Sequence, residues 1–146
     1  MELDPTVWGP HYWFVLFSIA VSYSNNPNDV IKKKYYDFFH NLPLFLPHNE
    51  IGDEFSKLLD DYPVTPYLDS KDSLMKWINF IHNRINIKLG KPELKLSEAV
   101  EEYYKHYLPQ DIQKETIRKR NEKFLYIFII CCLMSFGIYS VRKKRG

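Results

Sequence analysis

Hydrophobic and polar positions alternate with the period of α-helices over most of the first 109 residues. The clearest case is residues 74–89, where apolar side chains recur every three or four positions and form one continuous stripe. Ser70 or Asp69 can cap the start of this helix, Gly90 can end it in the left-handed conformation, and Pro92 prevents its continuation. Few segments have the alternation of a β-strand, so the pattern predicts an all-α fold.

Further helices are predicted around this strongest one. Turn-forming residues at 25–28 and a proline-bounded connector at 42–47 divide the remaining apolar pattern. The predicted helices cover about 11–23, 29–41 and 48–60, and a short helix that Ser97 caps follows at 97–107. This order predicts a four-helix bundle with a short fifth helix.

A run without charged side chains covers residues 124–141, between a basic stretch at 110–123 and a basic tail at 142–146. As a helix this run is about 27 Å long, close to the lower limit for crossing a bilayer core. We therefore predict four parts: a helical domain at 1–109, a basic linker at 110–123, a C-terminal transmembrane helix at 124–141, and the tail. Positive charge on both sides leaves the orientation in the membrane open.

The formal net charge is only +2, and the basic excess lies in the C-terminal third. Without a folded recognition motif this excess does not predict nucleic-acid binding, and beside an apolar run it favours membrane headgroups. Cys131 and Cys132 are the only cysteines, and adjacent cysteines rarely bond to each other. The sequence therefore contains no disulfide framework, no Cys-x-x-Cys motif and no standard zinc pattern.

The helix predicted at 74–89 carries the best candidate binding groups. His82 and Asn86 are four residues apart and share a face, with Asn83 beside them, so all three flank the apolar stripe. Such a placement suits hydrogen bonds to a buried polar ligand, but the same groups could equally satisfy buried backbone or water. Lys88 and Lys91 could meet a pyrophosphate or remain solvated.

Residues 77–92 read W-x4-H-N-x2-N-x-K-L-G-K-P, which resembles the flavin-binding helix of the FAD-linked sulfhydryl oxidases of the Erv/ALR type. The start W-G-P-x-x-W-x-x-L at 8–16 is similar to that of compact viral members. The resemblance covers roughly residues 8–107 and implies FAD as cofactor and a homodimer through the first helices. It also implies a virion or host intracellular membrane as the location. By position it implies cofactor contacts from Trp13, Tyr23, His82, Asn83, Asn86, Lys88 and Tyr103.

The departures from this resemblance concern its chemistry. The family's redox Cys-x-x-Cys pair maps to His48 and Ile51, and a second cysteine pair maps to Asn79 and Leu96. Phe17 stands where the family has a histidine that contacts the cofactor. An imidazole cannot store two electrons as a disulfide does, so no residue is predicted to be catalytic.

Three functions remain open on the sequence. The first is a membrane-anchored, degenerate paralogue without thiol oxidase activity that still holds FAD. The second is an FAD-dependent enzyme that forms disulfides by using cysteines of a partner protein. The third is a cofactor-free membrane scaffold.

Overall fold

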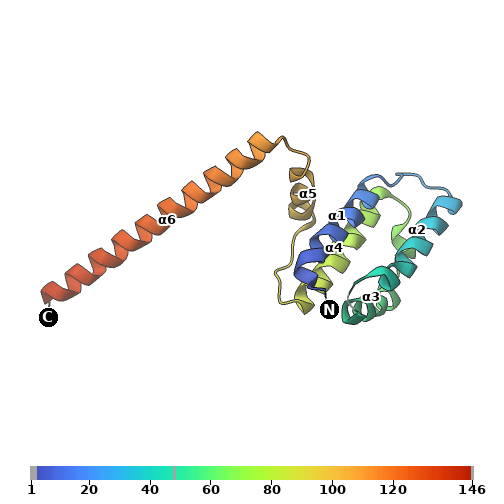
Figure 1. Ribbon diagram of the computed structural model, residues 1–146, viewed down its shortest axis with the longest axis horizontal. Coiled ribbons are helices and arrows are strands. Elements are labelled where there is room, and N and C mark those ends of the chain that lie inside the picture. The colour runs from blue at the N-terminus through green and yellow to red at the C-terminus, as the bar shows by residue number, and fades with distance from the viewer. Residues whose placement is uncertain (1–2, 48, 146) are drawn as a thin grey trace. The chain divides into compact units, whose positions relative to one another are not determined.

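The computed structural model describes residues 3–47 and 49–145, without the side chains of residues 49, 110, 113, 116 and 136–145. Within this part of the chain every regular element is a helix, which agrees with the all-α prediction (Figure 1). The elements in order are α1 (Pro5–Val21), α2 (Asp29–Asn41), the 3-10 turn η1 (Leu42–Phe45), α3 (Asn49–Asp61), the 3-10 turn η2 (Thr65–Tyr67), α4 (Lys71–Lys88), α5 (Leu96–Lys105) and α6 (Gln110–Arg145).

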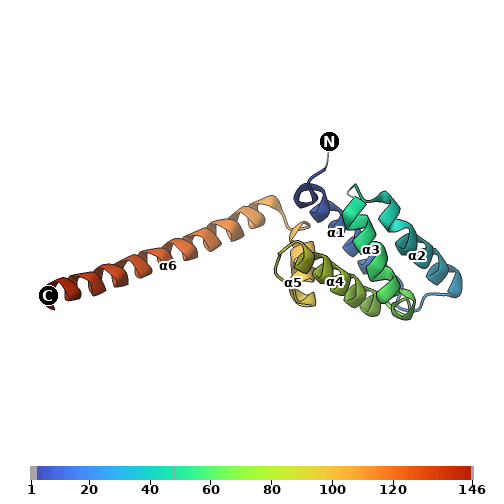
Figure 2. The same cartoon turned by 90° about the horizontal axis from the view of Figure 1, so that it is seen from below.

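The first four helices enclose one hydrophobic core. Helices α1 and α4 make the most extensive contact, and α5 lies beside this pair in both ribbon views (Figures 1 and 2). Aromatic and aliphatic side chains from all four helices are buried against one another. The core includes Leu16, Phe17 and Ala20 of α1, Phe39 of α2, Phe55 and Leu58 of α3, and Leu74, Trp77, Ile78 and Ile81 of α4.

Helix α4 begins and ends where its sequence predicts. The Ser70 hydroxyl accepts a hydrogen bond from the amide of Ser73 at 3.3 Å, which satisfies one free donor of the first turn. Gly90 has a φ of 67°, the left-handed conformation that ends helices. The amide of Lys91 then donates to the carbonyl of Asn86 at 2.8 Å, so the chain turns back at this point.

Helix α1 begins earlier than predicted. The carboxylate of Asp4 accepts from the amide of Thr6 at 2.7 Å, and Pro5 occupies the first turn, where a missing N–H has no cost. Pro10 lies inside the helix, whose predicted start was about residue 11. A proline at this position removes one hydrogen bond of the helix, and the helix nevertheless begins at Pro5.

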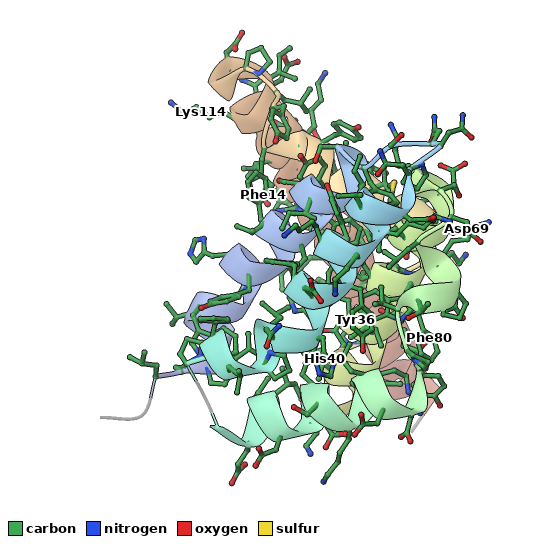
Figure 3. The ribbon with its side chains drawn as sticks, turned by 90° about the vertical axis from the view of Figure 1, so that its right-hand side faces the viewer. Phe14, Tyr36, His40, Asp69, Phe80 and Lys114 are labelled. Carbon is green, nitrogen blue, oxygen red and sulfur yellow. The ribbon has the colours of Figure 1, made fainter. Side chains whose placement is uncertain are left out.

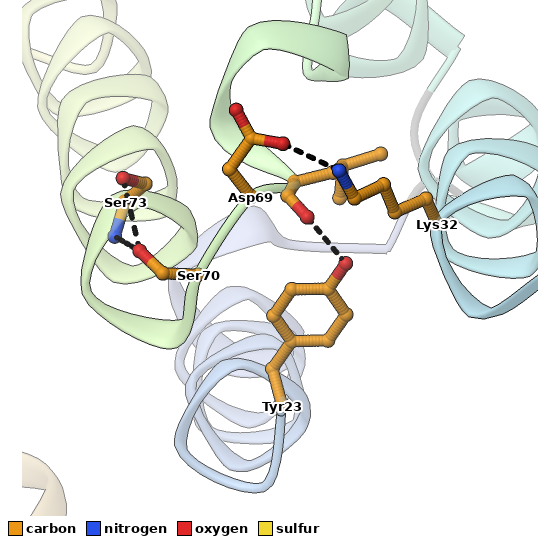
Figure 4. A network of polar contacts seen from close by, with 6 residues as sticks. Tyr23, Lys32, Asp69, Ser70 and Ser73 are labelled. Carbon is orange, nitrogen blue, oxygen red and sulfur yellow. Dashed lines mark hydrogen bonds and ion pairs between the residues drawn. The ribbon is translucent and has the colours of Figure 1, made fainter. Parts of the chain in front are cut away.

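Two long-range contacts link Tyr23, just after α1, and Lys32, in α2, to the segment before α4 (Figure 4). The hydroxyl of Tyr23 donates to the carbonyl of Leu68 at 2.7 Å, in a buried setting. Beside it the ammonium of Lys32 meets the carboxylate of Asp69 at 2.5 Å. These contacts fix one end of the bundle, because each joins residues more than thirty positions apart in the sequence.

Aromatic rings also contact each other on the outer faces of the bundle. On α2 the rings of Tyr36 and His40, one turn apart, stack with centroids 5.5 Å apart and planes 10° apart (Figure 3). On α4 the ring of Phe80 meets Tyr62 at 4.7 Å, edge to face. Both pairs leave their rings partly exposed. The homodimer through the first helices that the resemblance implies stays a prediction.

Helix α3 packs so closely on η1 that a side chain at position 52 would be crowded. A Cβ added to Gly52 would stand 3.0 Å from the carbonyl oxygen of Pro43, which is backbone and cannot rotate away. We expect Gly52→Ala to lower the free energy of unfolding by about 1 kcal/mol, because an overpacking cost of about 1–3 kcal/mol exceeds the roughly 1 kcal/mol gained in helix propensity.

Thermal unfolding followed by circular dichroism would measure this effect. The matched control is Gly9→Ala, at which an added Cβ meets nothing within 4 Å. We expect that variant to stay within about 0.5 kcal/mol of the parent, since the restriction that Pro10 places on the preceding residue roughly offsets the gain in propensity. Equal melting temperatures for the two variants would contradict the close packing at Gly52.

The C-terminal part of the chain differs from its prediction. The chain divides into two compact units, Met1–Tyr103 and Tyr104–Gly146. In the second unit the predicted linker and apolar run form one continuous helix, α6, in which ion pairs such as Arg118–Glu122 and Glu115–Lys119 link successive turns of the charged half.

Among the residues that the structure describes, no helix is long and apolar enough to cross a membrane. This contradicts the predicted transmembrane helix at 124–141 and, with it, the single-pass membrane localisation. Positions 136–141 of the predicted span lie outside the described side chains.

Candidate cofactor site

An aromatic cluster joins the middle of α1 to the middle of α4. The indole of Trp13 stacks on the imidazole of His82, with ring centroids 4.2 Å apart and planes 27° apart. Phe17, one turn further along α1, meets the same imidazole edge to face at 6.4 Å. Phe55 of α3 contacts the other end of the cluster, 6.4 Å from the Trp13 ring. Three helices therefore meet at His82.

Tyr103 of α5 extends this cluster over α1. Its ring lies 5.3 Å from that of Phe14 and 6.4 Å from that of Phe17. Tyr103 is buried, although α5 exposes most of its other side chains. The structure therefore brings Trp13, His82 and Tyr103, all predicted cofactor contacts, into one cluster that Phe17 links.

The imidazole of His82 is held neutral by its surroundings. Burial is the main cause that lowers the pKa of His82 to about 4, and the nearby positive charge of Lys91 contributes to the same shift. In the described part of the chain, its Nδ1 is buried and has no hydrogen-bond partner. Phe17, where the resemblance expects a histidine, offers only hydrocarbon on this side. His82 thus has one buried ring nitrogen without a hydrogen-bond partner in the described chain.

Asn83 and Asn86, the two asparagines that follow, differ in what they contact. The side-chain amide of Asn83 exchanges two hydrogen bonds with the backbone of Leu94, at 2.8 and 2.9 Å. Asn86 is also buried, and its main-chain carbonyl accepts from Lys91 in the turn at Gly90. Asn83 is therefore occupied by the protein itself.

Lys88, at the end of α4, forms an ion pair with Glu54 of α3. This hydrogen bond is also the main reason that the pKa of the Glu54 carboxyl is lowered. A lysine ammonium has three N–H donors, so one bond to Glu54 leaves two for an anionic ligand. The ion pair also holds the otherwise flexible lysine side chain at the α3–α4 junction.

Tyr23 lies apart from the aromatic cluster. It follows the end of α1, about 15 Å along the helix axis from Trp13, and its hydroxyl is bonded to Leu68. Its buried ring contacts Tyr35, with centroids 4.4 Å apart. The structure shows a tethering role for Tyr23, and the cofactor contact that the resemblance implies for it stays a prediction.

The positions that the resemblance assigns to cysteines are mostly apolar or amide. Ile51 is buried near the start of α3, whereas His48 lies outside the described residues. Asn79 is buried on α4 and Leu96 begins α5. Cys131 and Cys132, both exposed, lie in α6. In the part of the chain that is described, no three histidine, cysteine or carboxylate side chains gather to hold a metal ion.

Taken together, these residues fit a flat aromatic ligand with polar edges. His82 Nδ1 and Asn79 Oδ1 are buried without partners within the described chain, one helical turn apart on α4. Because the Trp13 and His82 rings touch, no third ring fits between them, so a ligand would contact the exposed part of Trp13 instead. Sequence reasoning missed the contacts of Phe14, Phe55 and Glu54, because each of these contacts joins separate helices.

The fold and the site define a class: a small helical bundle with an aromatic and imidazole cluster between its first and fourth helices. Comparison with known proteins agrees with this class. The model of the Erv1/Alr family matches residues 10–105. This chain therefore belongs to the Erv1/Alr family, whose members include FAD-linked sulfhydryl oxidases.

Individual relatives come from viruses and fungi. A protein named as a probable FAD-linked sulfhydryl oxidase of Acanthamoeba polyphaga mimivirus is 33% identical over 109 residues, which are 74% of this chain and 76% of the relative. The mitochondrial FAD-linked sulfhydryl oxidase erv1 of Schizosaccharomyces pombe is 30% identical over 89 residues, 61% of this chain and 49% of the relative. The crystal structure of the yeast Erv1 core superposes with a TM-score of 0.64 at 26% identity, covering 70% of this chain and 86% of that one.

Proposed function

We propose that this protein binds FAD at the Trp13–His82 cluster and has no thiol oxidase activity of its own. FAD binding is supported by one observation: the Nδ1 of His82 is buried without a partner in the described chain, beside the partly exposed indole of Trp13. Relatives named as FAD-linked sulfhydryl oxidases support the choice of FAD over other flat ligands. Lys88 is the residue that we assign to the pyrophosphate.

The proposed lack of thiol oxidase activity depends on where the cysteines lie in the chain. The unit Met1–Tyr103, which holds the cluster, contains no cysteine, and both thiols of the chain belong to α6. Bound FAD would accept the electron pair of a dithiol and pass it to oxygen. The Cys-x-x-Cys pair that the resemblance assigns to this step is absent, and the residues around the cluster are imidazole, amide and hydrocarbon. We therefore propose that this protein is a paralogue that binds the cofactor but lacks the cysteine pair that would pass electrons to it.

We expect full-length protein to purify with a visible flavin absorbance band and to consume no oxygen with dithiothreitol. The variant Cys131→Ser/Cys132→Ser is the matched control, and we expect it to behave as the parent in both measurements. Steady oxygen consumption that survives the double substitution would overturn the loss of activity. A colourless protein that does not acquire flavin absorbance after incubation with FAD would overturn the binding site.

The second candidate function is an enzyme whose partner supplies the thiols. It is favoured by one observation, that the aromatic and imidazole side of the site is kept while the cysteines are not. In that case a partner's dithiol would lose two electrons to the flavin and become a disulfide. Bleaching of the flavin by a dithiol protein, but not by dithiothreitol, would distinguish this function from the first.

A further inference from the structure

The segment between α4 and α5 runs back along α4 after the turn at Gly90. Two hydrogen bonds close that turn, from the amide of Gly90 to the carbonyl of Ile87 at 3.0 Å and from Lys91 to Asn86 at 2.8 Å. Leu94 then lies beside Asn83 and Asn79, about two and three turns before Gly90, since it bonds to both side chains. The position of Leu94 therefore sets where α5 starts.

Two buried asparagines hold Leu94 from both sides of its backbone. The Asn83 side chain donates from Nδ2 to the Leu94 carbonyl at 2.8 Å and accepts at Oδ1 from the Leu94 amide at 2.9 Å. Asn79 adds a second donor to the same carbonyl, at 3.2 Å. A carboxamide carries both a donor and an acceptor, so one Asn83 side chain pairs with one residue as a neighbouring β-strand would.

The burial of both asparagine side chains makes their hydrogen bonds to Leu94 costly to lose. Asn79 and Asn83 are each only 9% exposed. The hydrogen bonds to Leu94 are part-buried, and a backbone group that loses such a bond is less well solvated than in open water, so release of Leu94 is opposed while both amides are present. Asparagine is also the right length. Aspartate would lack the donor, leucine would lack both groups, and glutamine would place its amide one methylene too far.

Helix α5 depends on such a tether because it is short. It has 10 residues, and a helix of that length is marginal on its own. Its buried side chains are Ala99 and Tyr103, and Tyr103 contacts Phe14 and Phe17 on α1. The backbone of Leu94, two residues before α5, is therefore the point at which α4 can fix the helix that carries Tyr103.

We infer that Asn79 and Asn83 form a clamp on the Leu94 backbone that positions α5, and through it Tyr103, at the candidate cofactor site. Asn83 is thus a positioning residue that acts through Leu94, which differs from the direct cofactor contact that the resemblance implies. The effect of the clamp on flavin binding rests on the proposed function, whereas its effect on Leu94 does not.

Hydrogen exchange of the full-length protein tests the clamp directly, because the Leu94 amide donates to Asn83. In Asn83→Ala we expect that amide to exchange at least about tenfold faster, a ratio equivalent to one buried hydrogen bond. Amides of α5 should also exchange faster. Asn83→Asp keeps the acceptor for Leu94 but loses the donor, so its exchange rate should fall between those of the parent and the alanine variant.

The matched control is Asn86→Ala, which removes a buried asparagine of the same helix that does not bond to Leu94. We expect Leu94 protection in this variant to equal that of the parent. If Asn83→Ala does not fold by circular dichroism, Asn79→Ala replaces it. That variant removes only the 3.2 Å bond, so we expect a smaller acceleration at α5.

Flavin titration of the same variants separates the clamp from the proposed function. A colourless parent would overturn FAD binding and leave the exchange result intact as support for the clamp. Unchanged Leu94 exchange in Asn83→Ala would overturn the clamp. If flavin affinity fell in that variant while Leu94 protection stayed the same, Asn83 would be a direct cofactor contact instead.

Discussion

Replacing Trp77 with alanine is expected to lower the free energy of unfolding by about 3–5 kcal/mol, the usual cost of removing a large buried aromatic side chain. Trp77 is 1% exposed, and its ring meets Phe39 of α2 edge to face at 5.1 Å. Its indole N–H also donates to the carbonyl of Tyr62 at 2.9 Å, which would be left without that donor. Since domains of this size are stable by about 5–15 kcal/mol, the variant would lose much of its stability.

Urea unfolding followed by circular dichroism measures this loss. The matched control is Phe80→Ala, one turn along α4, because Phe80 is 39% exposed. Its ring contacts Tyr62 at the surface, so we expect it to cost about 1 kcal/mol. A Trp77→Ala midpoint equal to that of Phe80→Ala would show that the core does not depend on the indole.

The stability of the protein is expected to fall as the pH drops from about 6.5 to about 4, because His82 resists protonation in the folded state. Burial among Trp13 and Phe17 is the main cause of this low pKa, and the charge of Lys91 is the second. Above pH 6.5 both folded and unfolded chains have a neutral imidazole. Between the two values the unfolded chain binds a proton that the folded chain does not, so unfolding is favoured by up to roughly 3 kcal/mol.

Urea midpoints at several pH values between 4 and 8 test this dependence. In His82→Gln we expect the slope of stability against pH to become shallower over the window from about 6.5 to about 4. His11→Gln is the matched control, because His11 is exposed on the same aromatic-rich part of α1. We expect the control to keep the slope of the parent. A parent-like slope in His82→Gln would mean that the imidazole is not buried as described.

The sequence predicted best where local rules decide the structure. The start of α4 at the Ser70 cap and its end at Gly90 follow from residues within one turn of each boundary. The predicted span of α2, 29–41, is also the observed one. In the site, His82 lay on the expected face of its helix and meets Trp13 across the α1–α4 contact.

The sequence predicted less where distant segments decide. The amide of Asn83 could face a ligand or the protein, and the return of Leu94 along α4 decides between them. Tyr23 likewise donates to Leu68, 45 positions away. Helix α1 was predicted from about residue 11, whereas it begins at Pro5, because the cap at Asp4 was not recognised. The transmembrane prediction rested on the charge-free run at 124–141, its length and its basic flanks, but no described helix is long and apolar enough to cross a membrane.

The amide clamp also affects how the fold responds to its chemical surroundings. No disulfide can cross-link the helices within Met1–Tyr103, because all of the chain's sulfhydryl groups lie beyond it. Glutathione cannot open a carboxamide hydrogen bond. Ambient potentials of about −300 mV and about −180 mV, which span reducing and oxidising cell compartments, should therefore leave the folding of this unit equally complete.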